Sequence, residues 1–414
     1  MDKNQKNKFG LISTRRVSLF TIINFLIMFI VVFISPSSEK YILPYIFTSA
    51  NIKYTLCMFL IALEVIIIKK YSLDNCTKMI VFLFSTRCMI SIIHLFGTSE
   101  IDSEIKYLFS FICGICYLIA FSQSSIFVLK SNVVHHIVCY YVIICVQTII
   151  TYIIASRLHS GYFGLKSLLK IPIGASNYIE CWILMLTAFL FYYKKNSKFR
   201  YAIFFIGFIS SLLTRSKSAI LIWSIWLLII VFLVSKEKKG FGSFFTVAVT
   251  LIALLYFYDY LRELDFFDAS NQVFDNLFSG DSDKIEKAFN GRFDTYKYAF
   301  DAFNENLFTF FLGKGASYSS GYTPAHNWIL DILAKSGIVG LIVVIVLYTI
   351  IFKQLHSNSK TNDFAKPAII MMVFVILNSM WEPCLDGFLF SIPYYTIIGF
   401  GIQQTDPKLD NDRG

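Results

Sequence analysis

The sequence predicts an all-α membrane protein that crosses the bilayer many times. Of its 414 residues, 56% are hydrophobic and only 15% are charged, whereas a soluble domain carries about 25% charged residues. Apolar stretches close to the roughly 20 residues that a helix needs to cross the hydrocarbon core recur along the chain. The formal net charge of +10 agrees with basic residues gathered in cytoplasmic loops, and it does not require a nucleic-acid partner.

We expect about twelve transmembrane helices, each an apolar stretch bounded by polar or basic residues. They cover residues 17–35, 47–68, 79–96, 107–129, 133–155, 173–193, 201–213, 219–234, 244–258, 328–352, 367–380 and 388–402. Basic clusters follow nearly every second span, and short basic loops stay on the cytoplasmic side. The N-terminus and the C-terminal tail are therefore predicted to be cytoplasmic.

A single long polar segment, 259–325, interrupts the apolar pattern. The alternation of the short basic loops places this segment on the extracytoplasmic side. It divides the chain into a region of nine N-terminal helices (1–258), the loop itself, and a region of three helices with the C-terminal tail (326–414).

The long loop is predicted to contain an amphipathic helix, which would lie on the membrane surface or pack over the bundle. The helical spacing that indicates it is carried by Phe293, Tyr296, Phe300 and Phe303. Asp281-Ser-Asp283 matches half of a calcium-binding loop, but the remaining ligands are missing. We therefore predict no metal ion.

The segment that ends the loop predicts a capped helix with a histidine at its start. Thr323 would be the N-cap and Pro324 the first helical residue. His326 would then lie in the first turn, where free backbone N–H groups and the helix dipole favour a neutral imidazole and a nearby anion. Gly337 and Gly340 lie one helical step apart and would allow another helix to approach closely.

Three cationic side chains are predicted on the same face as His326. Arg215 and Lys217 lie at the turn between the seventh and eighth spans, and Arg292 opens the loop helix. Each has an ordinary explanation when taken singly, since a boundary Arg often reaches lipid headgroups and a loop Arg is commonly solvated. Their predicted location on one face favours a shared site.

Ionisable residues inside the predicted spans need partners or a function. Glu64 and Arg87 lie on neighbouring spans at similar predicted depths, so we expect an ion pair, with a transport pathway as the alternative. Glu180 follows the polar stretch 174–178, which is expected to interrupt the sixth span and line a cavity.

Five short motifs occur in the order found in one known family. They are Ile173-Gly-Ala-Ser-Asn177, Leu213-Thr-Arg-Ser-Lys-Ser-Ala219, Gly291-Arg292, Leu312-Gly-Lys-Gly315 and the run from Pro324 to Gly340. With these motifs, about residues 171–341 resemble the O-antigen polymerase and ligase superfamily (Wzy and WaaL types). That family often has Arg after Ser in the second motif, where this chain has Lys217. The sequence therefore leaves open whether Arg215 or Lys217 takes the role of the family's Arg.

The resemblance implies a GT-C-like glycosyltransferase with twelve spans in the bacterial cytoplasmic (inner) membrane. Such enzymes transfer a lipid-diphosphate-linked oligosaccharide to an acceptor at the outer face. The acceptor is another undecaprenyl-diphosphate-linked repeat unit in a polymerase, and a lipid A–core sugar in a ligase. By this resemblance His326 would activate or orient the acceptor, while Arg292 and Arg215 or Lys217 would hold the diphosphate.

The chemistry agrees with this resemblance. A sugar hydroxyl is a poor nucleophile and a neutral histidine can accept its proton, while Arg or Lys can stabilise the charge that develops on a departing diphosphate. No cofactor is predicted. We favour a repeat-unit polymerase for O-antigen or capsule, which would work with a flippase and a chain-length regulator. The alternatives are a ligase of the same fold, a polysaccharide transporter or flippase, and a non-catalytic scaffold or sensor.

Overall fold

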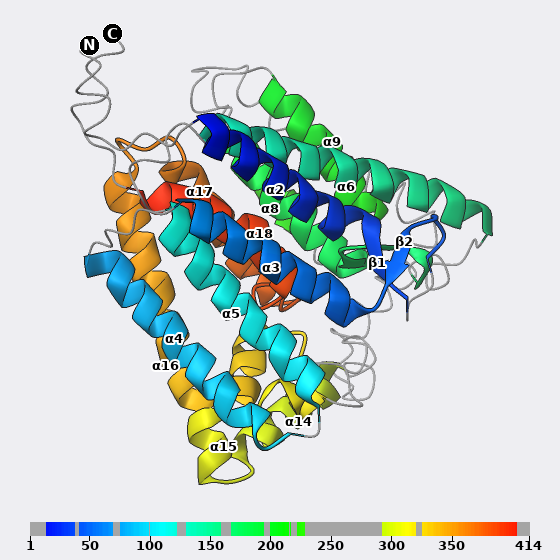
Figure 1. The fold of residues 1–414 in the computed structure, drawn as a ribbon. Helices are drawn as coiled ribbons and strands as arrows, with labels where there is room; N and C mark the ends of the chain where they lie inside the picture. Colours follow the sequence, from blue (N-terminus) through cyan, green and yellow to red (C-terminus); the bar gives the residue numbers. More distant parts are fainter. Residues whose placement is uncertain are drawn as a thin grey trace, which may run out of the picture.

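The computed structural model describes residues 14–37, 41–68, 75–98, 100–121, 130–158, 167–193, 199–214, 216, 222–227, 292–319 and 325–403. The elements in chain order are α2 (Thr14–Phe33), β1 (Ile34–Pro36), β2 (Ile46–Thr48), α3 (Ala50–Ile68), α4 (Asn75–Leu95), α5 (Ile101–Phe121), α6 (Lys130–Leu158), β3 (Lys170–Ile171), β4 (Gly174–Ala175), α8 (Ser176–Tyr193), α9 (Phe199–Leu213), α14 (Arg292–Asn304), α15 (Leu307–Leu312), the 3₁₀ helix η2 (Ala316–Ser319), α16 (Trp328–Asn358), α17 (Ala365–Ser379) and α18 (Phe388–Ile402). The long helices form a bundle, and α14 and α15 lie at one end of it (Figure 1).

The chain is a multi-pass membrane protein, as the composition predicts. Five helices are long and apolar enough to cross a bilayer, namely Ala50–Ile67, Asn75–Leu95, Ile101–Phe121, Ser131–Leu158 and Trp328–Asn358, and shorter apolar helices accompany them. The number of twelve spans stays a prediction. Only 222–227 of the eighth predicted span and none of the ninth belong to the described residues.

Two small sheets depart from an all-α fold. β1 pairs with β2 in parallel, and β3 pairs with β4 antiparallel. The second sheet is a tight hairpin directly before α8. The predicted interruption of the sixth span by 174–178 is only partly correct, because Gly174 and Ala175 form β4 whereas 176–178 already belong to α8.

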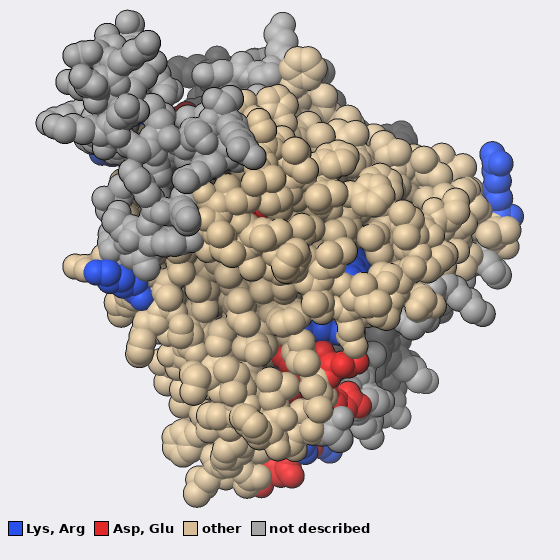
Figure 2. All heavy atoms as spheres, in the orientation of Figure 1, with Lys and Arg blue, Asp and Glu red and all other residues tan. Residues whose placement is uncertain are grey.

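The outer faces of the bundle are apolar, as a lipid environment requires. Phe82 is 69% exposed, Phe59 is 59% exposed and Ile342 is 54% exposed. Helices that are apolar all round in this way belong in a membrane or in a large core. Figure 2 shows that the broad face over α2, α3 and α5 carries few charged side chains.

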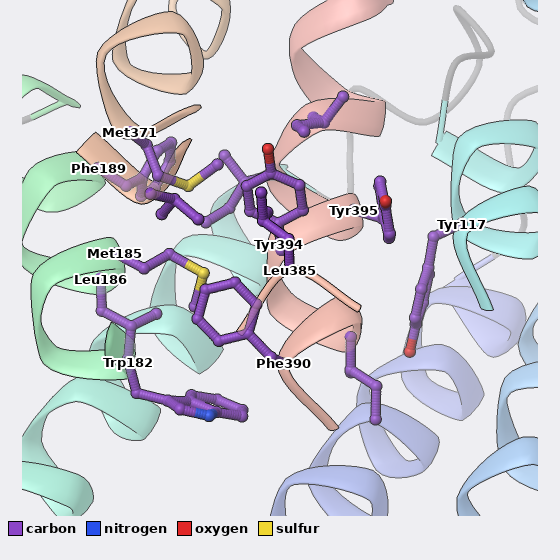
Figure 3. Packing of buried hydrophobic residues seen from close by; sticks show 14 of the residues in the cluster. Tyr117, Trp182, Met185, Leu186, Phe189, Met371, Leu385, Phe390, Tyr394 and Tyr395 are labelled. Carbon is purple, nitrogen blue, oxygen red and sulfur yellow. The ribbon is translucent and has the colours of Figure 1, made fainter. Parts of the chain in front are cut away.

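The centre of the bundle is formed by α8, α17 and α18. Every residue of α18 is buried, and α8 is buried along most of its length. Trp182 of α8 meets Phe390 of α18 edge to face, with ring centroids 5.9 Å apart, and Met185 and Leu186 pack beside them (Figure 3). This apolar packing holds the starts of α8 and α18 at a fixed separation.

The predicted loop helix is confirmed as α14. It packs over the bundle, because Ala299 and Ala302 lie in a buried cluster with Ala334 of α16. The predicted apolar stripe is only partly correct, since Phe300 is 51% exposed. The small Ala residues lie on the face that is pressed against α16, so the larger aromatic side chain is turned outward.

The end of α15 packs against a break in α16. Gly337 has φ 64°, in the left-handed region that glycine enters without strain. A Cβ added there would lie 2.4 Å from the carbonyl carbon of Phe311, so the predicted close approach is confirmed at Gly337. It is wrong at Gly340, where an added Cβ would meet Ser336 of the same helix.

The break frees carbonyl groups that the neighbouring loop then binds. The N–H of Lys314 donates to the carbonyl of Ala334 at 2.7 Å, and the N–H of Gly315 donates to that of Lys335 at 3.1 Å. The loop after α15 is thereby fixed against the middle of α16. The boundaries of the three predicted regions stay predictions, since most of 259–325 lies outside the described residues.

Candidate active site

His326 lies just before α16 rather than inside its first turn. Asn327 is the N-cap of this helix, and its side-chain oxygen accepts hydrogen bonds from the N–H groups of Ile329 and Leu330, both at 3.1 Å. The predicted helix start is therefore wrong; Thr323, its predicted cap, lies outside the described residues. Asn is among the best N-cap residues and lies directly before the apolar run, which explains why the helix begins there.

The imidazole of His326 faces a carboxylate from the turn between α17 and α18. His326 Nδ1 lies 3.1 Å from Glu382 Oε2, and Asn177 at the start of α8 donates from Nδ2 to the same oxygen at 3.0 Å. A further bond from Asn327 Nδ2 to the carbonyl of Met380, at 3.3 Å, ties the two segments together. Three elements far apart in the sequence therefore converge on one histidine.

This arrangement sets the chemistry of the ring. An ionised carboxylate only accepts hydrogen bonds, so the pairing with Glu382 assigns the proton of a neutral imidazole to Nδ1. The lone pair is then on Nε2, and no hydrogen bond to Nε2 is present within the described part of the chain. The His326 side chain is 25% exposed and that of Glu382 is 8% exposed. The ring therefore offers a basic nitrogen that a ligand can reach.

The backbone before His326 is held by a buried tyrosine. The N–H of Ala325 donates to the hydroxyl of Tyr318 at 3.0 Å, and this hydroxyl donates to Asp331 Oδ1 at 2.7 Å. Burial, with the Asp331 carboxylate beside it, raises the pKa of Tyr318, so the hydroxyl keeps its proton. Lys335 Nζ binds the other oxygen of Asp331 at 2.6 Å, so this carboxylate is paired as well.

Arg292 belongs to α14, the helix that also carries a residue bound to the backbone of His326. It is half-buried at the first position of that helix. One turn later, the hydroxyl of Tyr296 donates to the backbone carbonyl of His326 at 3.4 Å. Four helical residues span about 6 Å along the axis. Arg292 is thus one helical turn from a residue that binds the backbone of His326, and its place in the site stays a prediction.

The other two predicted cations, Arg215 and Lys217, lie outside the described residues. Their neighbours Thr214 and Ser216 are buried at the end of α9. The N–H of Ser216 donates to the hydroxyl of Thr214 at 3.3 Å. The alternative between Arg215 and Lys217 stays as the sequence left it.

The expected ion pair between Glu64 and Arg87 is wrong. Arg87 Nη1 lies 3.1 Å from Asp386 Oδ1, and Arg87 Nη2 donates to the Tyr107 hydroxyl at 2.6 Å, while Glu64 accepts from Asn24. Glu64 lies 14 residues after the start of α3, whereas Arg87 lies eight before the end of α4. At 1.5 Å per residue they differ in depth by about 9 Å, which the sequence alone did not reveal.

A cavity of about 490 Å³ opens near the first two turns of α3, α5, α8 and α18, with Lys335 of α16 on its wall. Gly174 and Ala175 line it, which confirms that the polar stretch before Glu180 borders a cavity. Three lysines also line it: Lys106, Lys170 and Lys335. Sequence reasoning missed these lysines because they come from three separate elements, and it missed Glu382 because nothing in a short turn indicates which histidine its acid will meet.

Residues 202–345 match the family model described as O-antigen ligase. This match agrees with the resemblance to the O-antigen polymerase and ligase superfamily that the sequence motifs indicate. Comparison with curated proteins gives no match. Arg292 and His326 lie inside the matched region, whereas Glu382 and Asn177 lie outside it. Segments outside the matched region therefore supply the side chains that contact Nδ1 of the histidine and its acid.

Metal binding is not favoured by the described side chains. Among the residues that the structure describes, no group of three or more His, Cys, Asp or Glu could hold a metal ion. That neither metal nor cofactor takes part stays a prediction.

Proposed function

We propose that this protein polymerises undecaprenyl-diphosphate-linked oligosaccharide repeat units into a surface polysaccharide, O-antigen or capsule, at the outer face of the cytoplasmic membrane. The observation that carries the proposal is the contact between His326 and Glu382, which leaves Nε2 of a partly exposed imidazole without a partner within the described residues. A superfamily that builds and transfers O-antigen glycans supplies the reaction class.

His326 acts as the general base. Its Nε2 takes the proton from an acceptor sugar hydroxyl as the oxygen of that hydroxyl bonds to the anomeric carbon of the donor. The bond between this carbon and the diphosphate oxygen breaks, and the lipid diphosphate departs with the electron pair. Glu382 stabilises the imidazolium that forms, by the logic that makes a carboxylate useful beside a catalytic histidine. A general base of this kind contributes about 10²–10⁴-fold to the rate.

Arg292, with Arg215 or Lys217, stabilises the departing diphosphate. Support for Arg292 comes from its place one turn from Tyr296, the residue that binds the backbone of His326. A guanidinium can bind two phosphate oxygens at once, whereas Lys acts as a point charge. The donor carries its own leaving group, so the reaction needs no nucleotide outside the cytoplasm.

The ligase reading is the second candidate, since the matched family model is described as an O-antigen ligase. It uses the same donor and the same histidine and differs in the acceptor, a lipid A–core sugar. The transporter alternative is less favoured, because the buried groups that suggested it bind other side chains: Arg87 binds Asp386, Glu64 accepts from Asn24, and Glu180 accepts from Asn378 at 2.8 Å. Within the described residues, one oxygen of each of these two glutamates is buried without a hydrogen-bond partner.

The test is reconstitution of the purified protein in liposomes with a lipid-diphosphate-linked repeat unit as the sole substrate. A ladder of polymer lengths is expected. Product that forms only after lipid A–core is added would assign the protein as a ligase, and no product under either condition would overturn glycosyl transfer.

The matched control for this assay uses two histidine variants. His326→Ala should give no ladder. His135→Ala should give the wild-type ladder, because His135 is exposed on α6 and its Nδ1 lies against the carbonyl of Ser131 in its own helix.

A further inference from the structure

The cavity between α3, α5, α8 and α18 contains more positive than negative side chains. Its volume of about 490 Å³ falls within the roughly 300–1,000 Å³ of small-molecule sites. Lys106, Lys170 and Lys335 line it, and Asp386 is the one acidic residue on its wall within the described part of the chain. Asp386 is paired with Arg87. The wall therefore favours an anionic ligand.

The lysines differ in how firmly they are held. Lys335 Nζ binds buried Asp331 at 2.6 Å and also lies 5.0 Å from the ring centroid of Tyr107. Lys106 Nζ lies over the ring of Tyr54, 5.6 Å from its centroid. Among the described residues, Lys106 has a cation–π contact and no ion pair with an acid, so its charge is available to an incoming anion.

The position of the cavity indicates a lipid headgroup. It lies where four helices begin, and the ends of spanning helices lie at the level of the headgroups. Aromatic side chains, among them Tyr54, Tyr178 and Phe388, share its wall. Aromatic rings with a polar edge suit this depth, since they contact both apolar chains and phosphate groups. A compact ammonium group is a common phosphate ligand.

The cavity is distinct from the His326–Glu382 pair but adjacent to it. Tyr178 on the cavity wall directly follows Asn177, which binds Glu382. Asp386 on the wall belongs to the same turn as Glu382. The cavity wall therefore includes the residue that follows Asn177 and a residue four positions after Glu382.

We propose that this cavity binds the phosphate of a second lipid-linked substrate through Lys106, Lys170 and Lys335. The inference that the bound lipid is a substrate rests on the proposed function, because joining two lipid-linked repeat units requires two lipid diphosphates to be held at once. One lies with the cations near His326, and the cavity holds the other. Binding itself does not depend on catalysis and is measured separately.

The test is acetylation of the wild-type protein in nanodiscs, with the modification of each lysine followed by mass spectrometry. Undecaprenyl diphosphate at ten times its dissociation constant should slow acetylation of Lys106 and Lys170 about tenfold, because about nine-tenths of the sites are then occupied. Lys314 is the control, since it is exposed and paired with Glu305. Its rate should not change.

Two further probes identify the source of the phosphate. Undecaprenol, which lacks phosphate, should give no protection. Inorganic diphosphate should protect only at much higher concentration. Equal protection by inorganic diphosphate would overturn the lipid assignment, and unchanged acetylation of Lys106 with saturating lipid diphosphate would overturn the site.

A variant links the cavity to the reaction. The double substitution Lys106→Gln with Lys170→Gln leaves the buried pair of Lys335 intact, and it should raise KM for the lipid-linked repeat unit about tenfold at nearly constant kcat, as a loss of uniform substrate binding does. Unchanged KM would overturn the role in the reaction. Protection of the lysines in a protein that forms no glycan would instead count against the proposed function alone.

Discussion

Two side-chain pairs, each with one carboxylate, differ in what surrounds them. Arg87 and Asp386 are closed in, with side chains 1% and 6% exposed, and Arg87 also binds Tyr107. His326 and Glu382 meet at the same N–O distance of 3.1 Å, yet the histidine is 25% exposed. Both acids come from one turn, four residues apart. A pair that is closed off from solvent fixes the fold, whereas a pair whose histidine offers an exposed nitrogen can take part in chemistry.

The largest expected effect is on stability, from breaking the closed pair. Arg87→Met leaves Asp386 buried without its partner, which should lower the free energy of unfolding by about 3–5 kcal/mol. Thermal unfolding in nanodiscs measures it. Lys314→Gln at the exposed pair with Glu305 is the control and should change stability by less than about 1 kcal/mol. Equal losses of stability in Arg87→Met and Lys314→Gln would show that burial does not make the Arg87–Asp386 pair important for the fold.

Breaking the open pair should affect rate rather than stability. In Glu382→Gln the amide can donate to Nδ1, so the imidazole can carry its proton on Nε2 and lose its basic nitrogen. We expect glycosyl transfer to slow by about 100-fold, at the lower end of a general-base contribution. The thermal midpoint should stay close to that of wild type.

The matched control for Glu382→Gln is Glu305→Gln, which changes an exposed acid beside Lys314. It should leave the rate as it is. A normal rate in Glu382→Gln would show that the carboxylate does not act on His326.

The smallest expected effect concerns the helix cap that follows His326. Asn327→Ala removes the acceptor for the N–H groups of Ile329 and Leu330 and should destabilise the protein by about 1 kcal/mol. Asn327→Asp keeps the cap and should recover most of this stability in the same unfolding measurement. No recovery would mean that the bond to the Met380 carbonyl, rather than the cap, holds this segment.

The helical membrane fold could be predicted from the sequence, which also singles out His326 as a candidate site residue. Few charges and recurrent apolar stretches are sufficient for the first, and a short motif pointed to the second. The partner of His326 could not be predicted, because Glu382 is 56 residues away in a turn and helix packing alone decides which acid arrives. The partner of Arg87 could not be predicted either, since the expected partner, Glu64, lies at a different depth in the bundle.

Local helix signals were also ambiguous. Thr323 and Asn327 are both good N-cap residues, and only the folded chain shows that Asn327 caps α16. The break at Gly337 was predictable as a site of close approach, but not as a change of backbone conformation. The left-handed backbone of Gly337 is stabilised by the loop that binds the freed carbonyl groups of α16. The pattern of apolar residues gives no sign that this loop contacts α16.

The most direct test of the central claim is the single-turnover rate of glycosyl transfer by wild type, His326→Ala, Glu382→Gln and the double variant in nanodiscs. We predict that His326→Ala is slower by about 10²–10⁴-fold and that the double variant is no slower than His326→Ala, because Glu382 acts through the histidine. A rate for His326→Ala within a few-fold of wild type, or a Glu382→Gln loss that persists in full without His326, would contradict the account.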